Sequence, residues 1–322
     1  MRVLTFTLSL ALASFGSLAS AQQFPNKPIT FIVPYAAGGN VDVSTRILQK
    51  ALGDSLGQPI IIENRPCGGG LIAGAYVARA KPDGYTLFVG SNGPVLFGPM
   101  TTPNPPYNWQ ENFEPISTLS LASNMMLVRS SFPAKTVKEF VEYAKEKPGE
   151  IRLGVSSVVS INHFLGLLLR QRADIQWTEV HYKGNAPAIT DIVGEHIDAG
   201  FQQLVDAKTH LESGKLRALA VGGSKRIDVL PGVPTMAEAG FPGVEGVTFN
   251  GVFAPKGTPK EVVDLLSEKI RIALDSKEAT EKFAALGSDS SGSTPAEFAD
   301  FLRKETEKWS DVIAKAKAAR KH

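Results

Sequence analysis

Three segments rich in glycine and small polar residues directly follow short apolar runs, and their residue types are suited to binding an anion. They are residues 34–42 (PYAAGGNVD), 66–70 (PCGGG) and 90–94 (GSNGP). Glycine lets backbone N–H groups come close to a ligand, and the start of a helix presents unpaired donors with partial positive charge. Such loops are typical of carboxylate or phosphate sites. The candidate ligand-binding residues here are Tyr35, Ala37, Gly38, Gly39, Asp42, Gly69, Ser91 and Asn92.

A second group of polar turns lies in the middle of the chain. Residues 154–163 (GVSSVVSINH) lead from an apolar run into a helical pattern, where Ser157 or Ser160 would cap the helix and offer a hydroxyl to a ligand. His163 would donate to a carboxylate or, alternatively, bond to a neighbouring loop. Lys183 and Gly184 stand in another strand-to-helix turn, where the lysine would face either an anion or solvent.

Patterns for covalent, metal or cofactor chemistry are missing from the sequence. It has no G-x-S-x-G, P-loop or H-E-x-x-H motif, and its five histidines lack the spacing of metal ligands. Residues 68–74 (GGGLIAG) depart from the dinucleotide-binding spacing, and the single cysteine, Cys67, is interpreted as a small residue filling a turn. We therefore expect no catalytic residue, no metal and no cofactor. Nearly balanced charge, with 34 Lys and Arg against 32 Asp and Glu, also argues against nucleic-acid binding.

The first 21 residues (MRVLTFTLSLALASFGSLASA) have the pattern of a secretory signal peptide. Arg2 supplies the positive start, an apolar stretch follows, and Ala-Ser-Ala at 19–21 provides the cleavage signature. No later segment offers about 18 uninterrupted apolar residues, the length of a membrane span. The sequence therefore predicts an exported protein whose mature chain begins at Gln22.

Short β-rich runs alternate with helical patterns at the start of the mature chain. Apolar runs of this kind are typical of parallel strands covered on both faces, and the short connections predict βαβ units. The expected strands are 29–33, 60–63 and 85–89, and the expected helices between them are 43–56 and 71–80. A linker-like stretch at 98–112, rich in proline and asparagine, and extended segments at 116–121 and 125–129 would lead into a second lobe.

The second lobe is expected to repeat this alternation. Its predicted elements are a helix after the Thr136-x-x-Glu139 capping box, strand 151–155, helix 161–172, strand 178–182, helix 186–194, strands 197–202 and 216–221, and the run 247–254. Two late helices would begin at Thr258-Pro259 and Thr294-Pro295, each with a threonine N-cap, and return to the first lobe. We therefore expect an α/β fold with one lobe at 22–124 and 250–322, a second at 125–249, and the ligand between them.

Several short motifs resemble the Bug family, the extracytoplasmic substrate-binding proteins of tripartite tricarboxylate transporters. They run in the family's order through nearly the whole mature chain and include Pro34-x-x-x-Gly38-Gly39-x-x-Asp42, Glu63-Asn64-Arg65-Pro66, Pro82-Asp83-Gly84-Tyr85, Tyr182-Lys183-Gly184, residues 214–220 (GKLRALA), Pro231-x-Val233-Pro234-Thr235, residues 253–259 (FAPKGTP) and Glu305-x-x-x-Trp309. The resemblance implies a two-lobed periplasmic protein of the Venus-flytrap type, with a mixed, mostly parallel sheet in each lobe. It also implies a monomer that binds a small carboxylate and works with membrane transporter subunits.

The sequence departs from the Bug pattern in the second lobe. Val158 and Val159 replace the usual glycines of the serine-rich loop, which would stiffen it. Gln202 stands where the family has an acid, and Asp206 is added, so both become candidate ligand residues. Tyr35 and Phe97 are candidates for packing on the carbon skeleton of the ligand, or else core residues. Two alternatives remain open: a sensory protein that signals to a membrane receptor, and an exported enzyme acting on a carboxylate.

Overall fold

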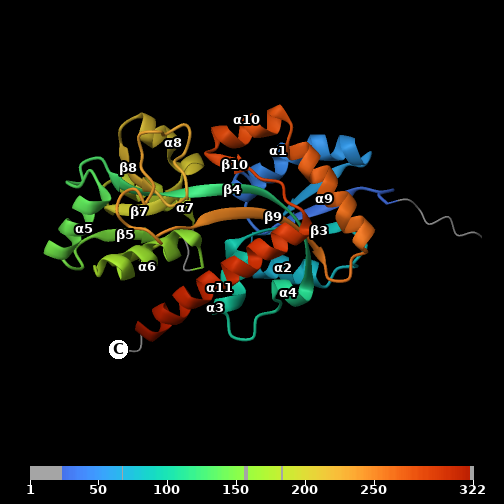
Figure 1. The fold of residues 1–322 in the computed structure, drawn as a ribbon, viewed down its shortest axis with the longest axis horizontal. Helices are drawn as coiled ribbons and strands as arrows, with labels where there is room; N and C mark the ends of the chain where they lie inside the picture. The colour runs from blue at the N-terminus through green and yellow to red at the C-terminus, as the bar shows by residue number, and fades with distance from the viewer. Residues whose placement is uncertain (1–23, 67, 156–158, 183, 320–322) are drawn as a thin grey trace, which may run out of the picture.

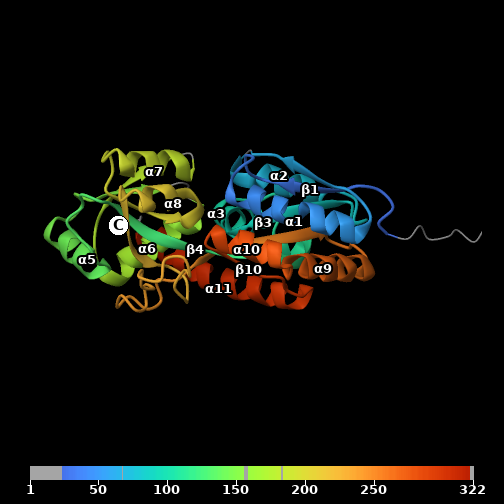
Figure 2. The same ribbon diagram turned by 90° about the horizontal axis from the view of Figure 1, so that it is seen from above.

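The computed structural model describes residues 24–319 except 67, 156–158 and 183. It shows an α/β protein with two lobes side by side (Figure 1). Seen from above, the lobe with α5 to α8 and the lobe with α1, α2 and α9 are joined by a long strand (Figure 2). The predicted signal peptide at 1–21 lies outside the described residues.

The first lobe is a mixed sheet covered by helices. Its parallel part has the order β2-β1-β3, and β9, β4 and β10 continue it by antiparallel pairing. The strands are β1 (Ile29–Val33), β2 (Ile60–Asn64), β3 (Thr86–Ser91), β4 (Phe113–Arg129), β9 (Val247–Pro255) and β10 (Ser288–Ser290). The helices are α1 (Asn40–Leu56), α2 (Leu71–Ala78), α3 (Gly98–Thr101), α4 (Trp109–Asn112), α9 (Lys260–Leu274), α10 (Lys277–Ala285) and α11 (Pro295–Ala319), with single turns η1 (Gly68–Gly70) and η2 (Gly93–Phe97).

The second lobe has the same design. Strands β6, β5 and β7 are parallel neighbours, and β4 pairs antiparallel with both β7 and β8. Its strands are β5 (Arg152–Val155), β6 (Thr178–His181), β7 (Ala199–Gln203) and β8 (Leu216–Val221). Its helices are α5 (Val137–Glu146), α6 (Ile161–Ala173), α7 (Asn185–Val193) and α8 (Leu204–Glu212).

One strand, β4, belongs to both sheets. Its first part pairs with β9 and β10, and its last five or six residues pair with β7 and β8. The two extended segments predicted at 116–121 and 125–129 are therefore a single strand. The sheets are mixed as predicted, and it is β4 and β9 that add antiparallel pairs to the parallel strands.

The C-terminal helix α11 touches both lobes. It packs on β4 and on α6, and it runs beneath the two lobes in Figure 1. The largest hydrophobic cluster is correspondingly continuous, including Phe88 and Phe253 of the first sheet and Leu153 and Phe164 of the second lobe.

Three local predictions need correction. The expected linker at 98–112 contains the short helices α3 and α4. Helix α9 has Pro259 as its N-cap, while the Thr258 hydroxyl donates to the Pro255 carbonyl at 2.8 Å, so the predicted threonine cap is wrong there. The sequence pattern also missed α8, α10 and β10. At α11 the capping box is present, with reciprocal bonds of 2.9 and 3.3 Å between Thr294 and Glu297.

Candidate ligand-binding site

The loop between β1 and α1 carries most of the predicted ligand-binding residues of the first lobe. The backbone N–H groups of its two glycines are already engaged in hydrogen bonds within the protein. The Gly38 N–H donates to the Asp42 carboxylate at 2.8 Å, and the Gly39 N–H points to the Ala36 carbonyl at 3.4 Å. The helix begins at Asn40, and the first helical bond runs from the Val43 N–H to the Gly39 carbonyl. The backbone donors at 40–42 are therefore the unpaired first turn of α1. Ala37, Gly38 and Gly39 are exposed.

Asp42 holds this loop in place. Its buried carboxylate accepts from Arg46 Nε at 2.9 Å and from Asn64 Nδ2 at 3.0 Å, in addition to Gly38. Burial alone would raise the pKa of Asp42, but the bonds from Arg46, Gly38 and Asn64 outweigh it and lower the pKa. These contacts give Asp42 a positioning role in the loop, and a direct contact with the ligand stays a prediction.

Tyr35 and Ser91 meet at the ends of β1 and β3. The Tyr35 hydroxyl lies 2.8 Å from Ser91 Oγ. Burial raises the pKa of Tyr35 to about 12, against a smaller opposite effect of the Ser91 bond, so the phenol stays protonated at neutral pH. A Cβ atom on Gly93 would be 3.1 Å from this hydroxyl, so the pair borders the start of η2.

Asn92 supports the start of β9. Its Oδ1 accepts from the Phe249 N–H at 3.1 Å, and its Nδ2 donates to the Val247 carbonyl at 3.2 Å. Both ends of the amide thus bond within the protein, which gives Asn92 a structural role, and its contact with a ligand stays a prediction. Phe97 is likewise a core residue: it is fully buried and its ring lies 4.4 Å from that of Phe164.

The two lobes touch where the loop before α6 meets the turns η1 and η2. A Cβ on Gly69 would be 3.8 Å from Val159 Cγ2, and a Cβ on Gly93 would be 3.1 Å from the Val159 carbonyl oxygen. Ser160 follows as the N-cap of α6, accepting from the His163 N–H at 3.3 Å. The contact brings the helix start of one lobe against the strand ends of the other. Ser157 lies outside the described residues.

In the second lobe, three helices begin where parallel strands end, and each brings a polar side chain to this edge. Asn162 on α6 is 3.4 Å (Nδ2) from Asn185 Oδ1 on α7, and Asn185 Nδ2 donates to Asp206 of α8 at 2.6 Å. Asn162 also donates to the Phe201 carbonyl at 2.6 Å and lies 3.4 Å from Gln202 Oε1. Gly184 is the N-cap of α7, whereas Lys183 lies outside the described residues.

His163, the next residue after Asn162, contacts a different strand. Its Nε2 lies 3.3 Å from the Glu179 carboxylate on β6, which Arg170 and His181 approach at 3.5 and 3.8 Å. The pKa of Glu179 is lowered, mainly by the His163 bond. The partner of His163 is thus a residue of a strand and not of a neighbouring loop, and its contact with a ligand carboxylate stays a prediction.

Side-chain amides that hold the loops of the candidate site are the feature that sequence reasoning missed. Asn250 Nδ2 donates to Asn40 Oδ1 at 2.6 Å and to Ser44 and Ser120 Oγ at 3.0 Å each, behind the first turn of α1. Asn64, Asn162 and Asn185 act similarly around the loops described above. Asn40, Asn162 and Asn185 lie in the first turns of α1, α6 and α7, beside the predicted glycine and serine turns, and this position is the signal that would have found them.

The arrangement can hold an anion through backbone donors and hydroxyls. Within the described part of the chain, no group of three His, Cys, Asp or Glu residues is placed to hold a metal. None of the described helices has the length and apolar character needed to cross a membrane. A cavity of about 680 Å³ does exist elsewhere, between α9 and the start of α11, but none of the predicted ligand residues lines it.

Two α/β lobes joined by a shared strand, with helix starts facing each other, define the periplasmic binding protein class. The chain belongs to the TctC family, described as the tripartite tricarboxylate transporter family receptor, and the family model matches residues 44–317. This membership confirms the resemblance to the Bug proteins.

Individual relatives agree with this assignment over nearly their whole length. Protein BugT of Bordetella pertussis is 34% identical over 305 residues, covering 94% of each chain. Among solved structures, Rpa4515 of R. palustris with adipate has a TM-score of 0.84 at 32% identity, covering 91% of this chain and 98% of that one. MatC from Rhodopseudomonas palustris with bound malate has a TM-score of 0.81 at 32% identity, covering 90% and 100%.

Proposed function

We propose that this protein captures a small organic mono- or dicarboxylate between its lobes in the periplasm and delivers it to the membrane subunits of a tripartite tricarboxylate transporter. The observation that carries the proposal is the meeting of helix starts from both lobes at Val159, Gly69 and Gly93. Family membership supports the same class of ligand, since the relatives Rpa4515 and MatC are described with adipate and malate.

Binding would need no covalent step. The unpaired N–H groups at the start of α1 and the Ser160 region would hold carboxylate oxygens, and each charge-assisted hydrogen bond would contribute about 1.5–3 kcal/mol. A few such bonds and some apolar contact correspond to roughly micromolar affinity, near −8 kcal/mol. The closed arrangement would be favoured because the ligand contacts both lobes only there. We expect the released ligand to be chemically unchanged.

A thermal-shift screen against aliphatic, aromatic and amino carboxylates tests this function. A ligand present at 100 times its dissociation constant should stabilise the folded protein by about 2.7 kcal/mol. Sugars and metal cations serve as the negative set. Stabilisation by sugars with silence from every acid would refute the carboxylate class, and conversion of the bound acid, followed by chromatography, would refute simple binding.

Replacing Gly39 should separate binding from folding. It is exposed with φ −76°, so a valine fits the backbone, and a Cβ would meet only the Ala36 carbonyl at 3.5 Å. We expect Gly39→Val to lower affinity about tenfold or more, by blocking access to the α1 donors, with less than about 0.5 kcal/mol lost in the free energy of unfolding. Calorimetric titration and urea unfolding measure the two quantities.

The matched control for Gly39 is Gly232, which is also exposed and would place a Cβ in open space on a loop outside the predicted ligand residues. Gly232→Val should leave both quantities unchanged. Equal losses of affinity and stability in Gly39→Val would make that glycine a structural residue.

Export and oligomeric state are part of the same proposal. We propose that cleavage follows Ala21, so that the mature protein begins at Gln22, and that the protein acts as a monomer. N-terminal sequencing of protein recovered from the periplasmic fraction tests the cleavage. Light scattering with and without bound carboxylate tests the monomer, and a ligand-independent dimer would contradict it.

A further inference from the structure

The network at the second-lobe edge contains one carboxylate, Asp206, among neutral amides. Asn162, Asn185 and Asp206 come from the starts of three different helices and form a continuous chain, with distances of 3.4 and 2.6 Å between successive members. Because they come from α6, α7 and α8, this alignment is a property of the folded lobe rather than of one local turn.

Asp206 is left with acceptor capacity that the described residues do not use. Among the described residues, its carboxylate accepts a hydrogen bond from Asn185. No Lys, Arg or His nitrogen of those residues forms an ion pair with it. Burial raises the pKa of Asp206, against a smaller lowering by the Asn185 bond. A half-buried carboxylate with a neutral partner is costly, and a cation brought to it would relieve that cost.

A second, independent feature points to a ligand at the same place. The Gln202 side chain is fully buried, with its Oε1 3.4 Å from Asn162 Nδ2, yet its Nε2 finds no hydrogen-bond partner in the described part of the chain. Buried amide nitrogens are normally paired, so this N–H group lacks an acceptor, which a carboxylate oxygen of the ligand would supply.

We propose that Asp206 binds a protonated amino group of the ligand, so that the cargo is an amino-substituted carboxylate rather than a simple dicarboxylate. The inference rests on the proposed function, because the carboxylate of the same ligand would be held by the backbone donors and hydroxyls proposed above. Asn185 is a positioning residue, fixing the Asp206 carboxylate towards the ligand. A dicarboxylate would instead bring a second negative charge to Asp206, which disfavours it.

Calorimetric titration with matched pairs of ligands tests the proposal. In each pair an ammonium group replaces one carboxylate: β-alanine against succinate, γ-aminobutyrate against glutarate, and δ-aminovalerate against adipate. For the wild-type protein we expect at least one amino member to bind about tenfold or more tightly than its dicarboxylate partner. Asp206→Asn should remove that preference by weakening the amino member about tenfold or more and strengthening the dicarboxylate.

The control is Glu212→Gln on the same helix, an exposed acid that is 3.8 Å from Lys208, and it should change neither affinity. Melting without ligand checks that Asp206→Asn folds, and Asp206→Ser gives a second, smaller replacement. If wild-type protein binds the dicarboxylates as tightly as the amino acids, or if Asp206→Asn leaves the ratio unchanged, the proposal for Asp206 is wrong while the carboxylate-binding function stands. If no carboxylate binds at all, both are wrong.

Discussion

Replacing Trp309 with alanine should lower the free energy of unfolding by about 3–5 kcal/mol and weaken ligand binding as well. The indole is fully buried, and its Nε1 donates to Glu305 at 2.7 Å. Its ring lies 5.5 Å from Phe97, which follows β3, and 5.8 Å from Phe164 on α6. One side chain of α11 therefore fills the space between aromatic residues of both lobes, and the cavity left by its removal would disturb their relative placement as well as the core.

Phe140→Ala is the matched control for Trp309→Ala. Phe140 is also fully buried, and it packs on Phe132 within the second lobe alone, with ring centres 5.5 Å apart. We expect a loss of stability of similar size, about 3–5 kcal/mol, with no change in ligand affinity. Chemical denaturation and titration at a temperature where both variants are folded measure the two effects. Equal affinity for Trp309→Ala and wild type would show that α11 only adds core volume.

The alternation of elements was predictable because the signal is local. Apolar runs bounded by glycine and proline predicted the strands β1, β2, β3 and β5 within two residues, and the threonine caps predicted the starts of α5 and α11. These features depend on residues within one turn of each other. The same kind of reasoning failed at α8, which begins directly after β7 with no capping side chain and no intervening turn residue.

The role of each polar residue was less predictable because it depends on contacts between distant segments. Asn92 appeared suited to a ligand, but its partners at Val247 and Phe249 are more than 150 residues away in the chain. Asp42 and His163 likewise bond to side chains of other elements, Asn64 and Glu179. A loop sequence shows which groups are available for hydrogen bonding, whereas only the fold shows which of them the protein has already used.

These internal bonds support the binding role indirectly. Asp42 fixes the loop before α1, and the backbone N–H groups in the first turn of α1 have no helical partner. Asn250 donates a hydrogen bond to the Asn40 side chain at the start of the same helix. Loops held in this way lose little conformational freedom when a ligand binds, which improves affinity without adding a direct contact. We therefore expect Asp42 to contribute to binding by pre-organising the backbone donors.

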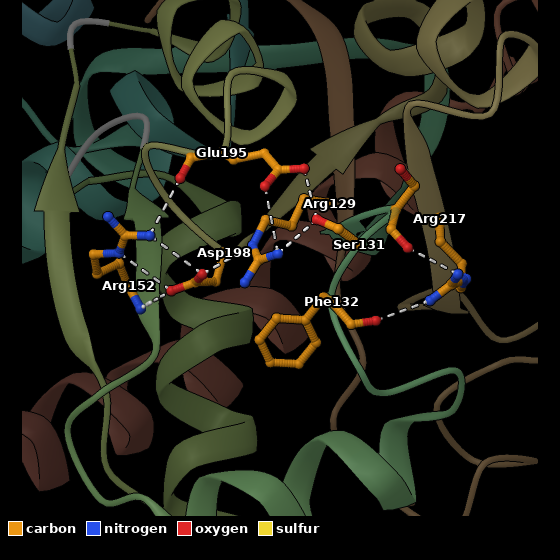
Figure 3. A network of polar contacts seen from close by, with 8 residues as sticks. Arg129, Ser131, Phe132, Arg152, Glu195, Asp198 and Arg217 are labelled. Carbon is orange, nitrogen blue, oxygen red and sulfur yellow. Dashed lines mark hydrogen bonds and ion pairs between the residues drawn. The ribbon is translucent and has the colours of Figure 1, made fainter.

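At the other ends of the second-lobe strands, a charged network is centred on Asp198 (Figure 3). Its carboxylate accepts from the Arg152 backbone N–H at 2.8 Å, from Arg129 Nε at 3.1 Å and from Arg152 Nε at 3.3 Å. Arg129 also donates to Ser131, which donates in turn to Glu195, both at 2.6 Å. The network joins the end of β4 to the beginnings of β5 and β7, away from the strand ends that lead into α6, α7 and α8.

Asp198→Asn should therefore cost about 3 kcal/mol of stability and leave ligand affinity unchanged, because it removes the shared anion from two arginines at the strand ends opposite the candidate site. Burial would raise the pKa of Asp198, but the bonds from Arg152 and Arg129 outweigh it and lower the pKa below its usual 3.8. A lowered pKa stabilises the folded state above the unfolded value, and that contribution disappears as the pH falls through the folded one. The stability difference between wild type and Asp198→Asn should thus be constant from neutral pH to about 5 and shrink below about 4.

Urea unfolding across this range measures it, with the exposed Asp264→Asn on α9 as a control that should show little change at any pH. A difference that persists undiminished in acid would show that the carboxylate's charge is not what stabilises this edge.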